Sequence, residues 1–151
     1  MNDIRRRTVA GLKTGDSFTL TRTFTEADVE AFTHVSRDHN PIHFDRRFIA
    51  LKGFSGPICH GLLVGGMITE IGGQMGWLAS GMSFRFRKPV YLGDTVTCRC
   101  SLIQVDEGLR ARAEAVFTNQ HGDTVLEADL YGVLPDAAAR KVLRELLDES
   151  A

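Results

Sequence analysis

The chain has 151 residues, of which 43% are hydrophobic and 25% charged, and its formal net charge at pH 7 is −1. This length predicts one domain with a sizeable core, so we expect residues 1–151 to form a single unit. The near-zero charge gives no electrostatic argument for a nucleic acid or an anionic membrane as partner. The basic run Arg5–Arg7 is the local exception, and we interpret it as a solvated, mobile terminus.

Neither secretion nor a membrane span is expected. No apolar stretch follows the N-terminal charges, which argues against a signal peptide. The longest apolar segment, 58–75, is shorter than the roughly 20 residues that a membrane span needs, and it contains His60 and Glu70. The cysteines are odd in number and lack the spacing of a metal site, so we expect reduced thiols in a cytoplasmic protein. These cysteines are Cys59, Cys98 and Cys100.

The first elements are predicted to be a strand and a helix. Residues 17–24 are rich in Thr and Phe, which is typical of a strand. Thr25, with Asp28 three positions later, has the spacing of a capping box for a helix over 26–36. This helix must end before Pro41, because proline cannot continue the hydrogen-bond ladder.

A turn and a short helix are expected next. Residues 38–44 predict the turn, since Asp and Asn side chains bond readily to nearby backbone groups. Asp45 is placed to cap a helix over 45–50. A loop with two glycines and a proline is expected at 53–57.

The longest helix is predicted over residues 60–74, although it is rich in glycine. Each glycine costs about 1 kcal/mol relative to alanine in a helix, so this helix needs close packing to persist. We therefore expect a central helix held inside a curved sheet, with small alanines on facing strands leaving room for it. The glycines are Gly61, Gly65, Gly66, Gly72 and Gly73.

The second half of the chain predicts strands joined by short turns. Alternating apolar and polar residues indicate the strands, which are expected at 82–87, 95–105, 109–117 and 124–134. A terminal helix follows Pro135, with apolar residues at helical spacing. The fold class is therefore α+β, an antiparallel sheet wrapped around one long central helix.

Asp38 and His43 are the candidate catalytic pair. A carboxylate and an imidazole can share the proton transfers that activate a water and protonate a carbon. Asn40 lies between them and is placed to position a water or to hold the turn. The alternative is a structural turn that ends the helix and contains a hydrogen-bonded histidine.

Gly61 is the second candidate feature, at the start of the central helix. The first N–H groups of a helix lack internal partners and carry a partial positive charge, which suits a carbonyl oxygen that gains charge. The alternative is a plain helix start with glycine for close packing. His60 is interpreted either as a residue that shapes the site or as a structural histidine. Arg87 lies on an alternating strand, where it either meets a phosphate group or belongs to the solvated face.

These residues form an ordered motif that resembles the signature of the MaoC-like, (R)-specific enoyl-CoA hydratases. The similarity covers about residues 18–135, and residues 136–151 form an added C-terminal helix. The motif consists of Asp38–Asp45 (DHNPIHFD), Gly56-Pro57-Ile58 and His60-Gly61-Leu62, with Phe24–Asp28 before it and Phe86–Val90 and Gly93-Asp94 after it.

The resemblance implies the hotdog fold and a site for acyl-CoA thioesters. Asp38 and His43 would hold the water that adds to C3 of a trans-2-enoyl thioester and would deliver a proton to C2. The N–H of Gly61 would hold the thioester carbonyl, and Asn40 would orient the site. The candidate substrate-binding residues are Asn40, Pro57, His60, Thr69 and Arg87. Thr69 stands where the family often has serine.

The resemblance also implies a homodimer, with higher assemblies open, and the reaction needs neither a metal nor a cofactor besides the coenzyme A of the substrate. Two other functions stay open. One is a hotdog acyl-CoA thioesterase, and the other is a non-catalytic module that binds acyl-CoA.

Overall fold

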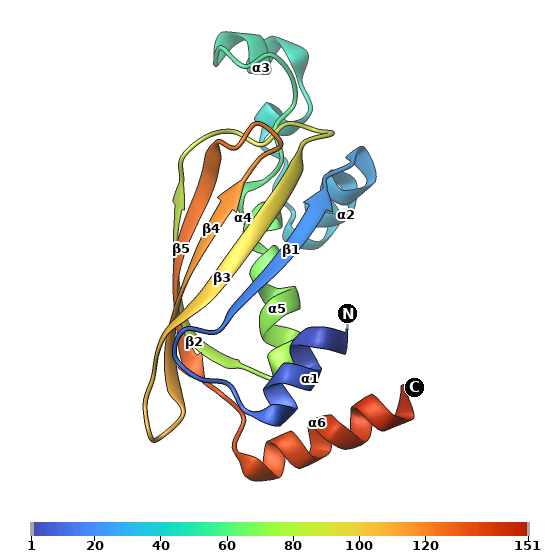
Figure 1. Ribbon diagram of the computed structural model, residues 1–151. Helices are drawn as coiled ribbons and strands as arrows, with labels where there is room; N and C mark the ends of the chain where they lie inside the picture. The colour runs from blue at the N-terminus through green and yellow to red at the C-terminus, as the bar shows by residue number, and fades with distance from the viewer. Residues whose placement is uncertain (1, 151) are drawn as a thin grey trace.

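The computed structural model describes residues 2–150 and contains a five-stranded antiparallel sheet with the order β1-β3-β4-β5-β2. The strands are β1 (Ser17–Thr23), β2 (Leu78–Phe86), β3 (Thr95–Val105), β4 (Arg110–Thr118) and β5 (Thr124–Val133). The sheet curves around the central helical segment, and the helices gather on its concave side (Figure 1). The antiparallel sheet predicted from alternation is confirmed.

Strand β2 starts at Leu78, earlier than the predicted residue 82. The pairing of β2 with β5 shifts register between Ala79 and Gly81. A bulge of this kind inserts a residue and breaks the two-residue alternation. The pattern in the sequence therefore revealed only the part of the strand after the bulge.

The central helix forms two consecutive segments, α4 (Gly61–Gly65) and α5 (Met67–Met75). Gly66 separates them, but its N–H still donates to the Leu62 carbonyl at 2.9 Å, so the chain direction is kept. The predicted single helix over 60–74 is thus correct in place and has one irregular turn. The side of α5 that faces the sheet buries Met67, Ile68, Ile71 and Met75.

The glycines of α4 face aromatic rings of β2. A Cβ on Gly61 would overlap the ring of Phe86, and a Cβ on Gly65 would lie 3.1 Å from the ring of Phe84. These glycines are four residues apart on one helix face, and the two rings are two residues apart on one strand face. The closest approaches to these two glycines therefore involve phenylalanine rings.

Residues 2–10 form helix α1 (Asn2–Ala10), so the prediction of a mobile terminus was wrong. Ile4 and Thr8 are buried. The Arg7 guanidinium lies 4.2 Å from the centre of the Phe18 ring and donates to the Ser17 carbonyl at 2.9 Å. The run of arginines drew attention away from Ile4 and Thr8, the buried side on which this helix packs against the rest of the chain.

The remaining helices are α2 (Glu26–Ser36), the 3-10 turn η1 (Pro41–His43), α3 (Arg46–Leu51) and α6 (Ala137–Glu149). Helix α2 has its predicted bounds and the predicted capping box of Thr25 and Asp28. Asp45 caps α3, as predicted. Helix α6 lies beside α1 at the end of the molecule opposite α3 (Figure 1). Within residues 2–150, no helix has the length and apolar character needed to cross a membrane.

Candidate active site

A ladder of side-chain hydrogen bonds shapes the turn after α2. The Ser36 hydroxyl accepts from the N–H of Asp38 at 3.1 Å, and the Asp38 carboxylate accepts from the N–H of Asn40 at 3.0 Å. The side-chain amide oxygen of Asn40 (Oδ1) then accepts from the N–H of Ile42 at 3.1 Å. Each side chain thus accepts a hydrogen bond from the backbone N–H two residues ahead. This bonding pattern is the reason why Asp, Asn and Ser are favoured in turns. This shows that the side chain of Asn40 holds the turn.

His43 is 7% exposed and is held in one tautomer. Its Nδ1 lies 2.6 Å from the backbone carbonyl of Ile58. Since a carbonyl only accepts, Nδ1 carries a proton, and in the neutral ring Nε2 keeps its lone pair. The neutral ring therefore presents a proton acceptor on the side of Asp38.

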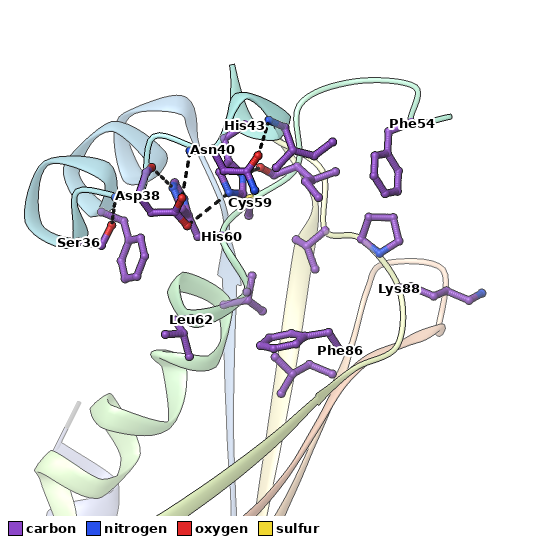
Figure 2. A pocket seen from close by; sticks show the side chains of 18 of the residues that line it. Ser36, Asp38, Asn40, His43, Phe54, Cys59, His60, Leu62, Phe86 and Lys88 are labelled. Atoms are coloured by element: carbon purple, nitrogen blue, oxygen red, sulfur yellow. Dashed lines mark hydrogen bonds and ion pairs between the residues drawn. The ribbon is translucent and has the colours of Figure 1, made fainter. Parts of the chain in front are cut away.

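Asp38 and His43 lie side by side, with 3.8 Å between Oδ2 of Asp38 and Nε2 of His43 (Figure 2). This distance is too long for a direct hydrogen bond. The Asp38 side chain is 47% exposed, while His43 is buried behind it. One water beside the pair can therefore hydrogen-bond to both free atoms.

Both residues line a cavity of about 720 Å³. Gly61 and Leu62 of α4 form a second wall, and Phe86 lies across the cavity from Asp38 (Figure 2). Apolar side chains close the inner end, where Val64, Val90 and Leu126 are buried. Lys88, with Arg87 before it, marks the solvent side. The cavity thus joins a polar pair, a helix start and an apolar interior.

Similarity to known proteins identifies the family of this chain. The family model described as "MaoC like domain" matches residues 9–124. This chain belongs to the MaoC-like domain family. It is 33% identical, over 113 residues, to an (R)-specific enoyl-CoA hydratase of Aeromonas caviae, covering 71% of this chain and 84% of that protein. It is 31% identical to a mitochondrial 3-hydroxyacyl-[acyl-carrier-protein] dehydratase of Arabidopsis thaliana, covering 83% and 79% of the two chains.

Solved structures show the same fold. The (R)-hydratase of A. caviae involved in PHA biosynthesis superposes with a TM-score of 0.78 at 31% identity, covering 83% of this chain and 98% of that one. The unliganded R-hydratase PhaJ1 of Pseudomonas aeruginosa gives 0.77 at 29% identity, with 85% of each chain covered. The hotdog fold expected for this MaoC-like chain is confirmed.

His60 of the MaoC-like motif is buried, and its hydrogen bonds go to the protein itself. Its Nε2 lies 3.2 Å from the Asp38 carbonyl and 3.3 Å from the Thr33 hydroxyl. Its ring stacks on His43 with 3.8 Å between centroids and 26° between planes. Burial is the main cause that lowers the pKa of His60. His60 lines the cavity, but its ring nitrogens are buried or bonded to protein groups, so these contacts support a structural role.

Asp38, His43 and His60 also offer nitrogen and oxygen atoms within 4.8 Å of one another, the composition of a metal site. The two imidazoles are stacked, however, and their lone pairs lie in nearly parallel planes. Such lone pairs do not converge on one ion at the 2.0–2.1 Å that metal–imidazole bonds require. The arrangement fits proton transfer better than metal binding.

The structure does not bring two predicted substrate-binding residues into the cavity. Thr69 is exposed, and its hydroxyl donates to the Gly66 carbonyl at 2.6 Å. Pro57 lies outside the cavity wall, next to Ile58, which lines it. The family resemblance assigned both to the site, but the helix direction and the path of the loop leave them outside the cavity.

Arg87 does line the cavity, and it is paired with a neighbouring carboxylate. Its guanidinium donates to Glu127 at 2.7 and 2.8 Å, and Lys88 lies 3.1 Å from Asp123. These exposed pairs are of the kind that contributes little to stability. Both side chains remain at the solvent side of the cavity.

Three contacts that shape the site were not predicted from the sequence. Ser36 starts the hydrogen-bond ladder, Ile58 holds His43, and the Phe86 ring takes the space beside Gly61. The spacing of Ser36, Asp38 and Asn40 carries a readable signal, since each holds the residue two positions ahead. The other two contacts join segments that are distant in the chain and leave no local pattern.

Proposed function

We propose that this chain is an (R)-specific enoyl-CoA hydratase, which reversibly adds water to a trans-2-enoyl-CoA to give a (3R)-3-hydroxyacyl-CoA. The main support is the placement of Asp38 beside His43, with 3.8 Å between their free atoms, on the wall of a cavity that Gly61 also lines. Relatives named hydratases and dehydratases at 30–33% identity support the same class of reaction.

The dyad would hold and deprotonate the attacking water. Nε2 of His43 is free because Nδ1 donates to Ile58, and Oδ2 of Asp38 is free because Oδ1 accepts from Asn40. One O–H bond of water breaks, its oxygen bonds to C3, and the dyad delivers a proton to C2. The reverse sequence is dehydration.

Gly61 would stabilise the charge that develops on the thioester oxygen. It is the first residue of α4, so its N–H has no acceptor within that helix. A donor placed where negative charge develops stabilises the transition state more than the ground state. The Phe86 ring against Gly61 would direct the acyl chain along the apolar inner wall.

The place of coenzyme A and the cofactor requirement also belong to this proposal. The coenzyme A moiety would extend past Arg87 and Lys88 at the solvent side, and the reaction would use no metal or additional cofactor.

The thiols of Cys59, Cys98 and Cys100 are free and buried, which supports a reducing compartment such as the cytoplasm. Burial raises the pKa of Cys59 to about 12, so this cavity-lining thiol stays protonated and is unsuited to a thioesterase nucleophile.

A homodimer through the β2 edge completes the proposal. β2 is an edge strand whose side chains are nearly all exposed, unlike those of β3 and β5. Its exposed apolar residues include Leu78, Met82 and Phe86. An exposed apolar edge strand is a surface that proteins normally cover.

The test is hydration of crotonyl-CoA by the purified protein, followed as loss of the absorbance of the conjugated thioester, with chiral analysis of the product. Asp38→Asn keeps an oxygen acceptor for Asn40 but removes the charge. His43→Asn keeps a donor for the Ile58 carbonyl but removes Nε2. We expect each variant to lower kcat by about 10²–10⁴-fold.

His121→Asn is the control, because His121 is exposed in the turn between β4 and β5. It should retain the activity of the unmodified protein. Unchanged activity in both dyad variants would refute their roles. Release of free thiol from a saturated acyl-CoA without hydration would indicate a thioesterase, and binding without turnover would indicate a binding module.

A further inference from the structure

His60 has a fixed tautomer that follows from its partners. The Thr33 hydroxyl donates to the Val29 carbonyl at 2.7 Å, so it offers His60 only a lone pair. The Asp38 carbonyl is also an acceptor. Nε2 of His60 therefore carries the proton, and Nδ1, which is buried, has no partner among the described residues.

This donor holds the backbone of the catalytic turn. Asp38 follows Arg37, whose left-handed backbone (φ 59°) ends α2, and the Asp38 side chain is largely open to solvent. The Ser36 hydroxyl fixes the N–H of Asp38, and His60 fixes its carbonyl from a segment 22 positions later in the sequence. The peptide of Asp38 is thus held on both sides.

The same ring also supports His43. The two rings stack at 3.8 Å, and His43 is held at its other side by the carbonyl of Ile58. The segment that contains Ile58 and His60 is itself fixed, because the N–H of Cys59 donates to Val90 at 2.7 Å. Ile58 and His60, both within the three residues before Gly61, therefore set the positions of both members of the dyad.

The chemistry of His60 suits support and not proton transfer. Its ring is 2% exposed, and the groups around it are the His43 ring, the Asp38 backbone and carboxyl, Thr33, and the rings of Phe32 and Phe44. A proton on Nδ1 would add an unpartnered buried charge next to His43. A neutral ring of fixed orientation avoids this cost.

We infer that His60 is a positioning residue: through its Nε2–H on the Asp38 carbonyl and its stack on the His43 ring, it sets the spacing of the dyad without contacting substrate. The inference rests on the proposed hydratase function. Misplacement of a catalytic group by about 1 Å can cost about 10²-fold in rate, so loss of this support should affect turnover more than substrate affinity.

Two substitutions separate the hydrogen bond from the ring. His60→Gln keeps an amide donor the same number of bonds from Cα as Nε2, whereas His60→Phe keeps a flat ring but has no donor. In crotonyl-CoA hydration, we expect His60→Phe to lower kcat by about 10–100-fold with KM within about twofold. His60→Gln should recover most of that loss. His34→Phe and His34→Gln, at an exposed position on α2, are the matched controls.

The other outcomes contradict the inference. A raised KM with unchanged kcat in either variant would assign His60 to substrate binding. Equal losses in Gln and Phe variants, or a Phe variant with the activity of the unmodified protein, would show that the Nε2–H donor does not position the dyad.

A measurement independent of activity separates this inference from the proposed function. In ¹⁵N-histidine spectra of the unmodified protein, His60 should carry its proton on Nε2 and His43 on Nδ1. A His60 ring that exchanges between tautomers would overturn the inference even if the protein hydrates crotonyl-CoA. The expected tautomers together with an absence of hydration would instead refute the hydratase proposal.

Discussion

At the scale of single residues, local hydrogen bonds build most of the site. Ser36, Asp38 and Asn40 each accept from a backbone N–H two residues ahead, so the turn is specified within a short stretch of sequence. Such local bonds compete well with helix and stop α2 where the site begins. The long-range contacts of His43 and His60 then select one orientation for each ring.

The buried His60 makes stability depend on pH. Its pKa in the folded chain is below its ordinary value of 6.5, mainly because burial disfavours the charged form. Between these two pKa values the unfolded chain binds more protons than the native one, so stability rises with pH in that window. The free energy of unfolding should therefore fall as the pH decreases below about 6.5.

Urea denaturation at pH 8 and pH 5.5, at one protein concentration, measures this effect. His60→Gln should show a smaller loss of stability between the two pH values than the unmodified protein. The pKa values of Asp28, Asp123 and Asp129 are lowered from 3.8 by their hydrogen-bond and charged partners, and these groups titrate below the window. Equal losses in both proteins would contradict the assignment to His60.

At the scale of elements, the packing of α4 on β2 explains two of the glycines that make the central helix intrinsically weak. Gly61 and Gly65 admit the rings of Phe86 and Phe84, which line one face of β2. The helix start, the cavity wall and the strand end are thereby brought together. Gly61 thus combines a packing role with its proposed role as a backbone donor.

A double-mutant cycle tests this packing. Gly61→Ala should lower the free energy of unfolding by about 1–3 kcal/mol, because the added Cβ overlaps the Phe86 ring. In a Phe86→Ala background the same change should cost less, which would give a measurable coupling energy in urea denaturation.

Gly72→Ala is the control for that cycle. Apart from its chain neighbours and the backbone of its own helix, no atom lies within 4 Å of a Cβ placed on Gly72. Its substitution should be neutral or stabilise α5 by up to about 1 kcal/mol through helix propensity. If Gly61→Ala costs the same with and without the Phe86 ring, the ring does not explain the glycine.

At the scale of the whole molecule, a single chain leaves the β2 edge of the sheet exposed to solvent. Helices α1, α2 and α5 lie on the concave side near β1, whereas β2 is the edge strand at the other end of the sheet (Figure 1). Phe86 is 56% exposed although it faces the cavity. A second copy at the β2 edge would cover this apolar surface and complete the wall of the site.

Sedimentation or light scattering tests the dimer. The unmodified protein should have twice the 16.7 kDa mass of the chain. Met82→Lys, on β2, should shift the mass toward the monomer, since a charge on an edge strand opposes edge pairing. Val116→Lys, on the central strand β4, is matched in exposure, at 43% against 45% for Met82, and should remain dimeric. A monomeric unmodified protein would refute the dimer.

The sequence by itself determined the elements whose causes are local. The capping box at Thr25, the cap at Asp45, the turn around Asn40 and the alternating strands β3 to β5 depend on neighbours a few residues apart. The ordered motif added the family and the fold. Helix α1 was missed because only its docking surface, not its composition, distinguishes it from a charged tail.

Only the tertiary structure decided which distant groups meet. It brought the Ile58 carbonyl to His43, His60 to the Asp38 backbone and Phe86 to Gly61. It also showed that Thr69 and Pro57 lie outside the cavity. These results depend on helix direction, strand register and close packing across long sequence separations. A linear pattern records which side chains are available, but the burial and distance that give them chemical roles arise only when the segments pack together.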